Sequence, residues 1–305
     1  MNRLPDGVLP VNKPAGMTSH DVVARARRLL GERRIGHTGT LDPMATGVLP
    51  LVIGRATRLA DVLQEMPKAY EAEMIFGIST DTEDITGRVT ESAEDVRLDE
   101  ARLQAALERF RGTIVQVPPM YSAVKVEGKR LYELAREGRT VERPPRHVTI
   151  YRLELAGFET SGERPVARLS VRCSKGTYIR TLCADIGKAL GIPAVMGKLV
   201  RTEAAGISLA ATVTLDDLER MVREGTPDAA IIPVDRAVAH LPAVHLADEQ
   251  ARRAANGRSV EAERVPAEAG PGALVRVYGP DRFIGLFRLA GNRRMAPFKV
   301  FAAER

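Results

Sequence analysis

One loop near the N-terminus carries the polar side chains whose types and spacing point most directly to chemistry. It spans residues 36–47, GHTGTLDPMATG, and places one imidazole, His37, and one carboxylate, Asp42, among small, turn-prone or hydroxylated residues. Its glycines allow positive φ or close backbone approach, and Pro43 fixes φ directly after the carboxylate. Two interpretations stay open from the loop alone: a presented reactive aspartate, or an ordinary turn of the kind that Asp-Pro often forms.

Two further segments hold polar groups that secondary structure alone does not require. Residues 68–70, KAY, begin a predicted strand, where the ring of Tyr70 is more often core than functional. Residues 173–180, CSKGTYIR, run from a strand end into the first turn of a predicted helix, where Arg180 opposes the helix macrodipole. A cation there indicates a carboxylate partner, with an ordinary surface pair as the alternative. If Arg180 reaches Asp42, the guanidinium holds that carboxylate ionised and oriented, as a nucleophile requires.

Several other chemistries lack their sequence signature. No second carboxylate accompanies Asp42, which disfavours the paired acid and base of a glycosidase. Residues 12–19 have the wrong glycine spacing for a phosphate-binding loop, and no zinc-deaminase motif is present. The two cysteines, Cys173 and Cys183, make neither a disulfide framework nor a zinc site, so no metal site is expected.

The charge distribution indicates a polyanionic partner. The net charge is +6, the isoelectric point is near 9.5, and basic residues gather directly before the 36–47 loop and again between residues 125 and 146. Basic surface beside a reactive loop suits a phosphate backbone, although a solvated helix face is the commoner explanation for either group alone. The first group consists of Arg25, Arg27, Arg28, Arg33 and Arg34.

Length and hydropathy leave room for two packed domains. The chain has 305 residues, 44% of them hydrophobic, and no apolar stretch approaches the length of a membrane span. The first residues lack the apolar core of a secretory signal. Together with the low cysteine count, these features predict a cytoplasmic location without membrane contact.

Apolar periodicity predicts an α+β fold. Strands and helices do not alternate regularly, which favours a largely antiparallel mixed sheet flanked by helices over a doubly wound sheet. From about Pro233 short strands with Gly/Pro turns predict a small β-rich C-terminal domain at 233–305, after a domain at 1–232. Residues 122–145 carry many charges and little core periodicity, so we expect an arm or loop there. The main expected strands are 8–11, 48–53, 70–78, 148–158, 166–173, 274–278 and 283–289, and the main expected helices are 19–30, 99–110, 177–190 and one opened by a capping box at Thr214.

Six short motifs follow one another along the chain: KPxGxTS at 13–19, GHxGTLDP at 36–43, KxY at 68–70, TDTxD at 80–84, SAxK at 122–125 and GTYIR at 176–180. Their order and spacing resemble the TruB family of pseudouridine synthases, over a match from about Leu9 to Thr202. After Thr202 the chain departs from the family pattern, because residues 205–207, AGI, stand where a glycine and an aromatic are expected. The C-terminal segment is similar to a PUA-type RNA-binding module in the pattern of short strands and Gly/Pro turns over residues 275–289.

The resemblance implies a fold, an activity and a partner. It implies the pseudouridine synthase fold for residues 1–232, a PUA-like RNA-binding domain at 233–305 and a mobile RNA-binding thumb arm at 122–145. The family isomerises uridine to pseudouridine in the T-loop of tRNA, at position 55. It breaks the N1–C1′ bond of a flipped-out nucleotide and remakes the bond at C5. The resemblance implies no cofactor and no metal, and a monomer that binds the T-stem-loop without an obligate protein partner.

The resemblance also implies roles for particular side chains. Asp42 is the nucleophile, or the base that starts glycosidic cleavage, and Arg180 pairs with it. Tyr70 stacks on the target uracil and serves proton transfer at C5. The residues expected to shape the pocket, hold the RNA open or support the site are His37, Tyr178, Leu199 and Lys13.

Two other functions remain open at this point. One is a tRNA-binding chaperone whose isomerase activity is incidental, and the intact set of Asp42, Tyr70 and Arg180 argues against a purely binding role. The other is the catalytic subunit of a guide-RNA-dependent relative. The developed arm at 122–145 favours the stand-alone type, since the guide-dependent relatives dispense with it.

Overall fold

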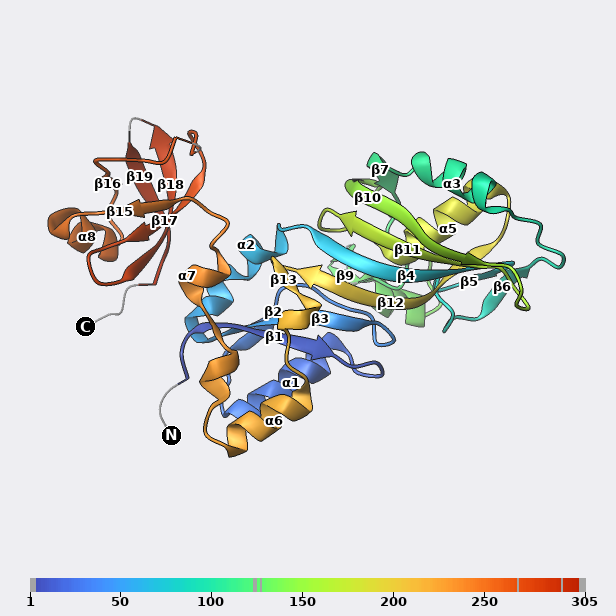
Figure 1. Ribbon diagram of the computed structural model, residues 1–305, viewed down its shortest axis with the longest axis horizontal. Coiled ribbons are helices and arrows are strands. Elements are labelled where there is room, and N and C mark those ends of the chain that lie inside the picture. Colours follow the sequence, from blue (N-terminus) through green and yellow to red (C-terminus); the bar gives the residue numbers. More distant parts are fainter. Residues whose placement is uncertain (1–3, 123–124, 127, 268, 292, 302–305) are drawn as a thin grey trace.

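A computed structural model describes residues 4–122, 125–126, 128–267, 269–291 and 293–301 (Figure 1). Ten strands within these residues form the main sheet: β1 (Gly7–Lys13), β2 (Ile35–His37), β3 (Thr46–Ile53), β4 (Lys68–Phe76), β7 (Gly112–Gln116), β10 (Arg146–Glu159), β11 (Val166–Cys173), β12 (Ala194–Ala204), β13 (Ile207–Ser208) and β14 (Ile232–Pro233). Their order is β14-β1-β3-β12-β4-β11-β10-β7, with β2 paired to β3 and β13 to β12. The predicted α+β class is confirmed.

The sheet is antiparallel throughout except at one junction. β3 and β12 pair in parallel, with Arg201 opposite Gly47, whereas the other edge of β12 is antiparallel to β4. The strand β12 therefore joins an N-terminal half, built on β1 and β3, to a second half built on β4, β11 and β10. The side chains expected to do chemistry come from both halves, so their distances depend on this junction.

Helix α1 (Ser19–Leu30) follows its capping signals. Thr18 and Asp21 form a capping box at the N-terminus, and Gly31 ends the helix with a φ of 63°, which a glycine adopts without strain. The buried face of α1 includes Val22 and Ala26 and packs on β1 and β3. Helix α6 (Leu215–Arg223), opened by the predicted capping box at Thr214, lies beside it (Figure 1).

Helices α3 (Glu100–Glu108) and α5 (Ile179–Leu190) cover the second half of the sheet. Leu182 and Ile186 of α5 are fully buried in one cluster with Met74 and Leu169 of the sheet. This packing anchors the first turn of α5, which carries Arg180. The shorter elements of these two halves are η1 (Gly54–Leu59), α2 (Ala60–Gln64), the strand pair β5 (Ile78–Thr80) and β6 (Val89–Ser92), η2 (Leu209–Ala211), η3 (Pro227–Ala230) and α7 (Val234–Ala237).

The C-terminal domain lies at one end of the molecule (Figure 1), and its Leu286 and Phe301 pack in one cluster with Val8 of the first domain. It contains α8 (Asp248–Ala255) and a sheet in the order β15 (Ala243–His245), β17 (Leu274–Tyr278), β18 (Phe283–Gly291), β19 (Arg294–Val300) and β16 (Val260–Glu261), which includes both strands expected there. The domain boundary expected at 233 stays a prediction. Pro233 pairs with Gly7, and Val234 packs in one cluster with Val8 of the first domain and Leu286 of the C-terminal domain.

The arm expected at 122–145 contains more regular structure than its composition suggested. Two short strands, β8 (Lys125–Val126) and β9 (Lys129–Arg130), pair, and α4 (Leu131–Arg136) follows. Leu131 and Leu134 are buried, because two leucines at a spacing of three give a short helix one apolar side. The expectation of an arm without core residues was therefore wrong at these two positions. Residues 123, 124 and 127 lie outside the described residues, and the expected mobility stays a prediction.

Candidate active site

The loop that carries Asp42 joins β2 to β3 and is held on both sides of the carboxylate. The Ser19 hydroxyl accepts a hydrogen bond from the Leu41 N–H at 2.8 Å and donates to the Leu41 carbonyl at 3.1 Å. The Lys13 ammonium donates to the Pro43 carbonyl at 3.2 Å. Side chains at both ends of the KPxGxTS motif therefore fix the backbone around Asp42.

The side chain of Asp42 pairs with Arg180, as expected from the sequence. The Arg180 Nε lies 3.0 Å from one carboxylate oxygen of Asp42, and Nη2 donates to the other at 3.4 Å. Arg180 is 5% exposed, whereas one third of the Asp42 side chain is exposed. The carboxylate thus rests on a buried cation and is open on its other side, which favours the presented aspartate over an ordinary turn.

Three chain segments meet at the Arg180 guanidinium. Besides Asp42, it donates to the Thr82 carbonyl and to the Tyr121 carbonyl, each at 2.8 Å. The buried carboxylate of Asp84 lies 3.8 Å from Nε and also accepts from the Thr86 N–H at 3.0 Å. Two residues of the TDTxD motif, Thr82 and Asp84, therefore help to orient Arg180.

An apolar cluster adjoins this pair. Tyr70 on β4 and Leu199 on β12 are buried in the same cluster as Leu41, the residue before Asp42. Burial raises the pKa of the Tyr70 phenol, so the group is neutral near neutral pH. An aromatic ring and a leucine beside a carboxylate form a surface on which a planar base can stack.

Three cationic side chains, Lys13, Lys68 and Arg201, are buried near the loop. Burial lowers the pKa of Lys13 to about 8 and that of Lys68 to about 8. The positive charge of Arg201 lowers both pKa values further. Lys68 donates to the Gln64 and Met66 carbonyls, at 2.8 and 2.9 Å. Lys68 and Arg201 were not predicted as site residues. Their only signal in the sequence is a cation within a segment that is otherwise buried.

His37 and Tyr178 flank the site without contacting its carboxylate. The His37 Nδ1 accepts from the Gly39 N–H at 3.2 Å, and burial lowers the pKa of the imidazole. Tyr178 is the N-cap residue of α5, and its ring centroid lies 5.7 Å from the guanidinium carbon of Arg146. In the described part of the chain neither side chain hydrogen-bonds to Asp42, and their expected contacts with RNA stay predictions.

The first basic group is only partly available to a ligand. Arg25 pairs with Asp216 and Glu219 at 2.8 and 3.2 Å, and Arg27 donates to the Ile35 carbonyl at 2.6 Å. Arg25 therefore forms a structural contact between α1 and α6. The members of the group that are exposed and form neither an ion pair nor a side-chain hydrogen bond with described residues are Arg28, Arg33 and Arg34.

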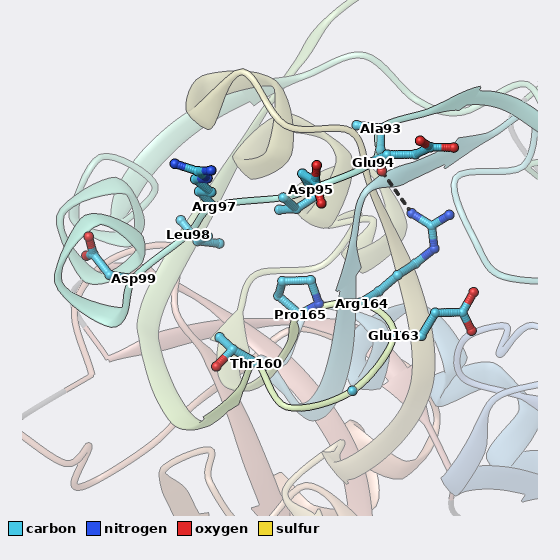
Figure 2. A pocket seen from close by; sticks show the side chains of 12 residues that line it. Ala93, Glu94, Asp95, Arg97, Leu98, Asp99, Thr160, Glu163, Arg164 and Pro165 are labelled. Carbon is cyan, nitrogen blue, oxygen red and sulfur yellow. Dashed lines mark hydrogen bonds between the residues drawn. The ribbon is translucent and has the colours of Figure 1, made fainter.

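A cavity of about 690 Å³ lies away from these residues, between segments 93–99 and 160–165 (Figure 2). Arg164 reaches across it and donates to the Gly77 carbonyl at 2.6 Å and the Ala93 carbonyl at 3.3 Å. None of the candidate site residues lines it. Among the residues that the structure describes, no three His, Cys, Asp or Glu side chains are placed to hold a metal ion, and no helix is long and apolar enough to cross a membrane.

Comparison with known proteins identifies the family. Residues 27–179 match the N-terminal domain of the TruB family pseudouridylate synthases, residues 180–239 match the tRNA pseudouridylate synthase B C-terminal domain, and residues 242–301 match the C-terminal domain of pseudouridine synthase II TruB. The chain belongs to the TruB family. It is a pseudouridine synthase, an isomerase that acts on RNA, and the resemblance in the six motifs is confirmed.

TruB relatives match nearly the whole chain. The tRNA pseudouridine synthase B of Geobacillus thermodenitrificans is 49% identical over 303 residues, which cover 97% of this chain and 99% of that protein. The Bacillus subtilis protein of the same name is 44% identical over 275 residues, covering 90% of this chain and 89% of its own. A solved structure described as an H/ACA RNP bound to a substrate RNA containing 2'-deoxyuridine is 26% identical, with a TM-score of 0.76 over 97% of this chain and 85% of that one.

Proposed function

We propose that this TruB enzyme converts uridine to pseudouridine at position 55, in the T-loop of tRNA. The relatives at 44% and 49% identity carry the name tRNA pseudouridine synthase B, and the T-loop position follows from the motif resemblance. The observation that carries the proposal is the pair of Asp42 and Arg180, joined at 3.0 Å beside the cluster of Tyr70 and Leu199. A carboxylate fixed on a buried cation and open to a ligand suits a reaction that begins at a sugar carbon.

The reaction exchanges one glycosidic bond for another without net gain or loss of atoms. The N1–C1′ bond breaks, the uracil turns, and C5 forms the new bond to C1′. C5 then loses its proton, and N1 takes one up. Asp42 begins this sequence as the nucleophile or as the base that starts glycosidic cleavage. Either role requires an oriented carboxylate, which the two contacts from Arg180 supply.

Tyr70 is proposed to hold the uracil and to serve proton transfer at C5. Its side chain is 7% exposed, and it is buried in one cluster with Leu41, the residue before Asp42. Stacking of a base on an aromatic side chain is worth about 1–3 kcal/mol. The target nucleotide loses roughly a few kcal/mol on leaving its stack in the RNA. Phosphate contacts to the exposed Arg28, Arg33 and Arg34 are proposed to offset the remainder.

The test is incubation of the purified protein with an unmodified tRNA transcript, followed by mapping of pseudouridine at single-nucleotide resolution. We expect product at the T-loop uridine. Asp42→Asn keeps the size of the side chain and removes its charge, so we expect loss of product with tRNA affinity within about threefold of the unsubstituted protein. Product only at another nucleotide contradicts the substrate position.

Asp81→Asn is a matched control for this substitution. Asp81 lies in the TDTxD motif, its side chain is 32% exposed against 33% for Asp42, and its nearest cation, Arg88, is 3.9 Å away. We expect turnover close to that of the unsubstituted protein. Substantial turnover by Asp42→Asn, or equal losses in both variants, contradicts the role of Asp42.

A further inference from the structure

Arg201 occupies the junction between the two halves of the sheet. Its backbone lies opposite Gly47 in the parallel pair with β3 and opposite Tyr70 in the antiparallel pair with β4. The approach to Gly47 is so close that a Cβ there would lie 2.2 Å from the Arg201 carbonyl oxygen. Arg201 thus stands between the strand that follows the Asp42 loop and the strand that carries Tyr70.

The Arg201 side chain ties that loop to β3. It is 1% exposed, and its Nε donates to the Val48 carbonyl at 2.7 Å. Nη1 and Nη2 donate to the carbonyls of Thr40 and Gly39, at 3.3 and 3.2 Å. One planar guanidinium therefore holds backbone groups on both sides of Asp42.

The Arg201 and Tyr70 side chains lie on the same face of the sheet, because the two residues stand directly opposite each other in the antiparallel pair of β12 and β4. The positive charge of Arg201 lowers the pKa of the Tyr70 phenol, against the larger effect of burial, which raises it. Arg201 therefore neighbours Tyr70 as well as the loop.

The partners of Arg201 are unusual for a buried arginine. In the described part of the chain it forms no ion pair, and the acceptors of its guanidinium are three backbone carbonyls. Burial of a charge without an opposite charge costs several kcal/mol, and an apolar side chain on β12 would avoid that cost. Its two cationic neighbours, Lys13 and Lys68, increase the cost.

We propose that Arg201 is a positioning residue that fixes the loop carrying Asp42 relative to Tyr70 on β4. The inference rests on the proposed roles of Tyr70 and Asp42 in pseudouridine formation. Because these two side chains come from different halves of the sheet, their separation is set by what bridges the halves. Arg201 bridges them with side-chain hydrogen bonds to the loop and to β3, and with its position directly opposite Tyr70 in the pair of β12 and β4.

Arg164 provides a matched control, because its guanidinium also bonds to backbone carbonyls, at a cavity that none of the candidate site residues lines (Figure 2). The variants Arg201→Lys, Arg201→Met and Arg164→Met are compared by thermal unfolding, by tRNA affinity and by the single-turnover rate of pseudouridine formation. Lysine keeps the charge and some donors but lacks the planar fork. Methionine removes the charge and all the donors.

We expect Arg201→Met to lower the single-turnover rate about 100-fold, since an error of about 1 Å in a reacting group costs that much. The rate of Arg201→Lys should be about tenfold higher than that of Arg201→Met. The tRNA affinity of every variant should stay within about threefold of that of the unsubstituted protein. Arg164→Met should lower the unfolding temperature without changing the rate. If Arg201→Met does not fold, the comparison of Arg201→Lys with Arg164→Met gives the same decision.

Three results overturn the inference. They are a rate near that of the unsubstituted protein for both Arg201 variants, an equal loss of rate in Arg164→Met, and a loss of tRNA affinity that accounts for the whole defect. Failure of the proposed function is seen separately, because the unsubstituted protein then forms no product at the T-loop uridine. Product at a different uridine leaves the comparison of rates intact.

Discussion

Replacement of Arg180 separates its electrostatic role from its geometric one. The guanidinium makes two contacts to Asp42, two to carbonyls and one, at 3.8 Å, to the buried Asp84 carboxylate. Arg180→Lys keeps a positive charge, but a single ammonium cannot occupy the Nε and Nη2 positions together. A charge-assisted hydrogen bond contributes about 1.5–3 kcal/mol. Loss of one such contact to Asp42 in the transition state therefore lowers the rate about 10- to 100-fold.

Arg180→Met removes the charge as well. It leaves the Asp84 carboxylate, whose side chain is 8% exposed, without its cation. Breaking a buried pair in this way costs about 3–5 kcal/mol. At about 2–4 °C for each kcal/mol, the unfolding temperature of the first domain should fall by roughly 10 °C. Turnover should fall below that of the lysine variant.

The assay is single-turnover pseudouridine formation on a tRNA transcript, with thermal unfolding followed by circular dichroism. Arg172→Lys is the matched control, because Arg172 pairs with Glu203 at 3.4 Å on the same sheet, where 46% and 30% of the two side chains are exposed. It should change neither quantity, since exposed pairs contribute at most about 1 kcal/mol. A rate for Arg180→Met within about threefold of the unsubstituted protein refutes the reasoning.

Three further predictions concern stability and reactivity. Gly47→Ala should destabilise the protein by at least about 3 kcal/mol in urea unfolding, because its φ is +105° and its Cβ would lie 2.2 Å from a carbonyl oxygen of β12. Gly16→Ala, at a φ of +83° with open space, should cost only about 1–2 kcal/mol, and equal costs would contradict the packing argument. Burial lowers the pKa of Lys13 from 10.5 to about 8, so the unfolded chain binds more protons between these pH values, and the free energy of unfolding should rise with pH relative to Lys13→Met. A flat difference over that range would refute this. Burial raises the thiol pKa to about 11 for Cys173 and about 12 for Cys183, so both should resist thiol reagents until urea unfolds the chain, and rapid labelling of either would show that it is accessible.

The parts of the fold that were predictable from sequence have local causes. Helix α1 begins and ends where Thr18 and Gly31 place its caps, because capping depends on a few neighbouring residues. Strands at 148–158 and 166–173 were expected from the sequence, and both are present as the antiparallel pair β10 and β11. The pair of Asp42 and Arg180 was expected because a cation in the first turn of a helix requires a reason.

Strand β12 was not predicted, and its geometry explains why. Its pairing with β4 is irregular between Met196 and Leu199 and again between Arg201 and Glu203, so buried positions do not alternate along it. A strand whose register shifts twice has no period of two for sequence reading to detect. Arg201 was missed for a related reason. Three of its partners are backbone carbonyls, which leave no trace in the identity of the residues that supply them.

The parallel pairing of β3 with β12 also determines when, during synthesis, the site can form. The Asp42 loop emerges from the ribosome long before β12, and a nascent chain that stops before residue 194 contains neither Arg201 nor the strand that lies between β3 and β4 and pairs with both. Contacts between such distant segments are slow to form because the intervening chain must first be ordered. The site can therefore form only after β12 has been synthesised. Chains truncated before β12 retain the Asp42 loop but lack the strand that aligns it with Tyr70.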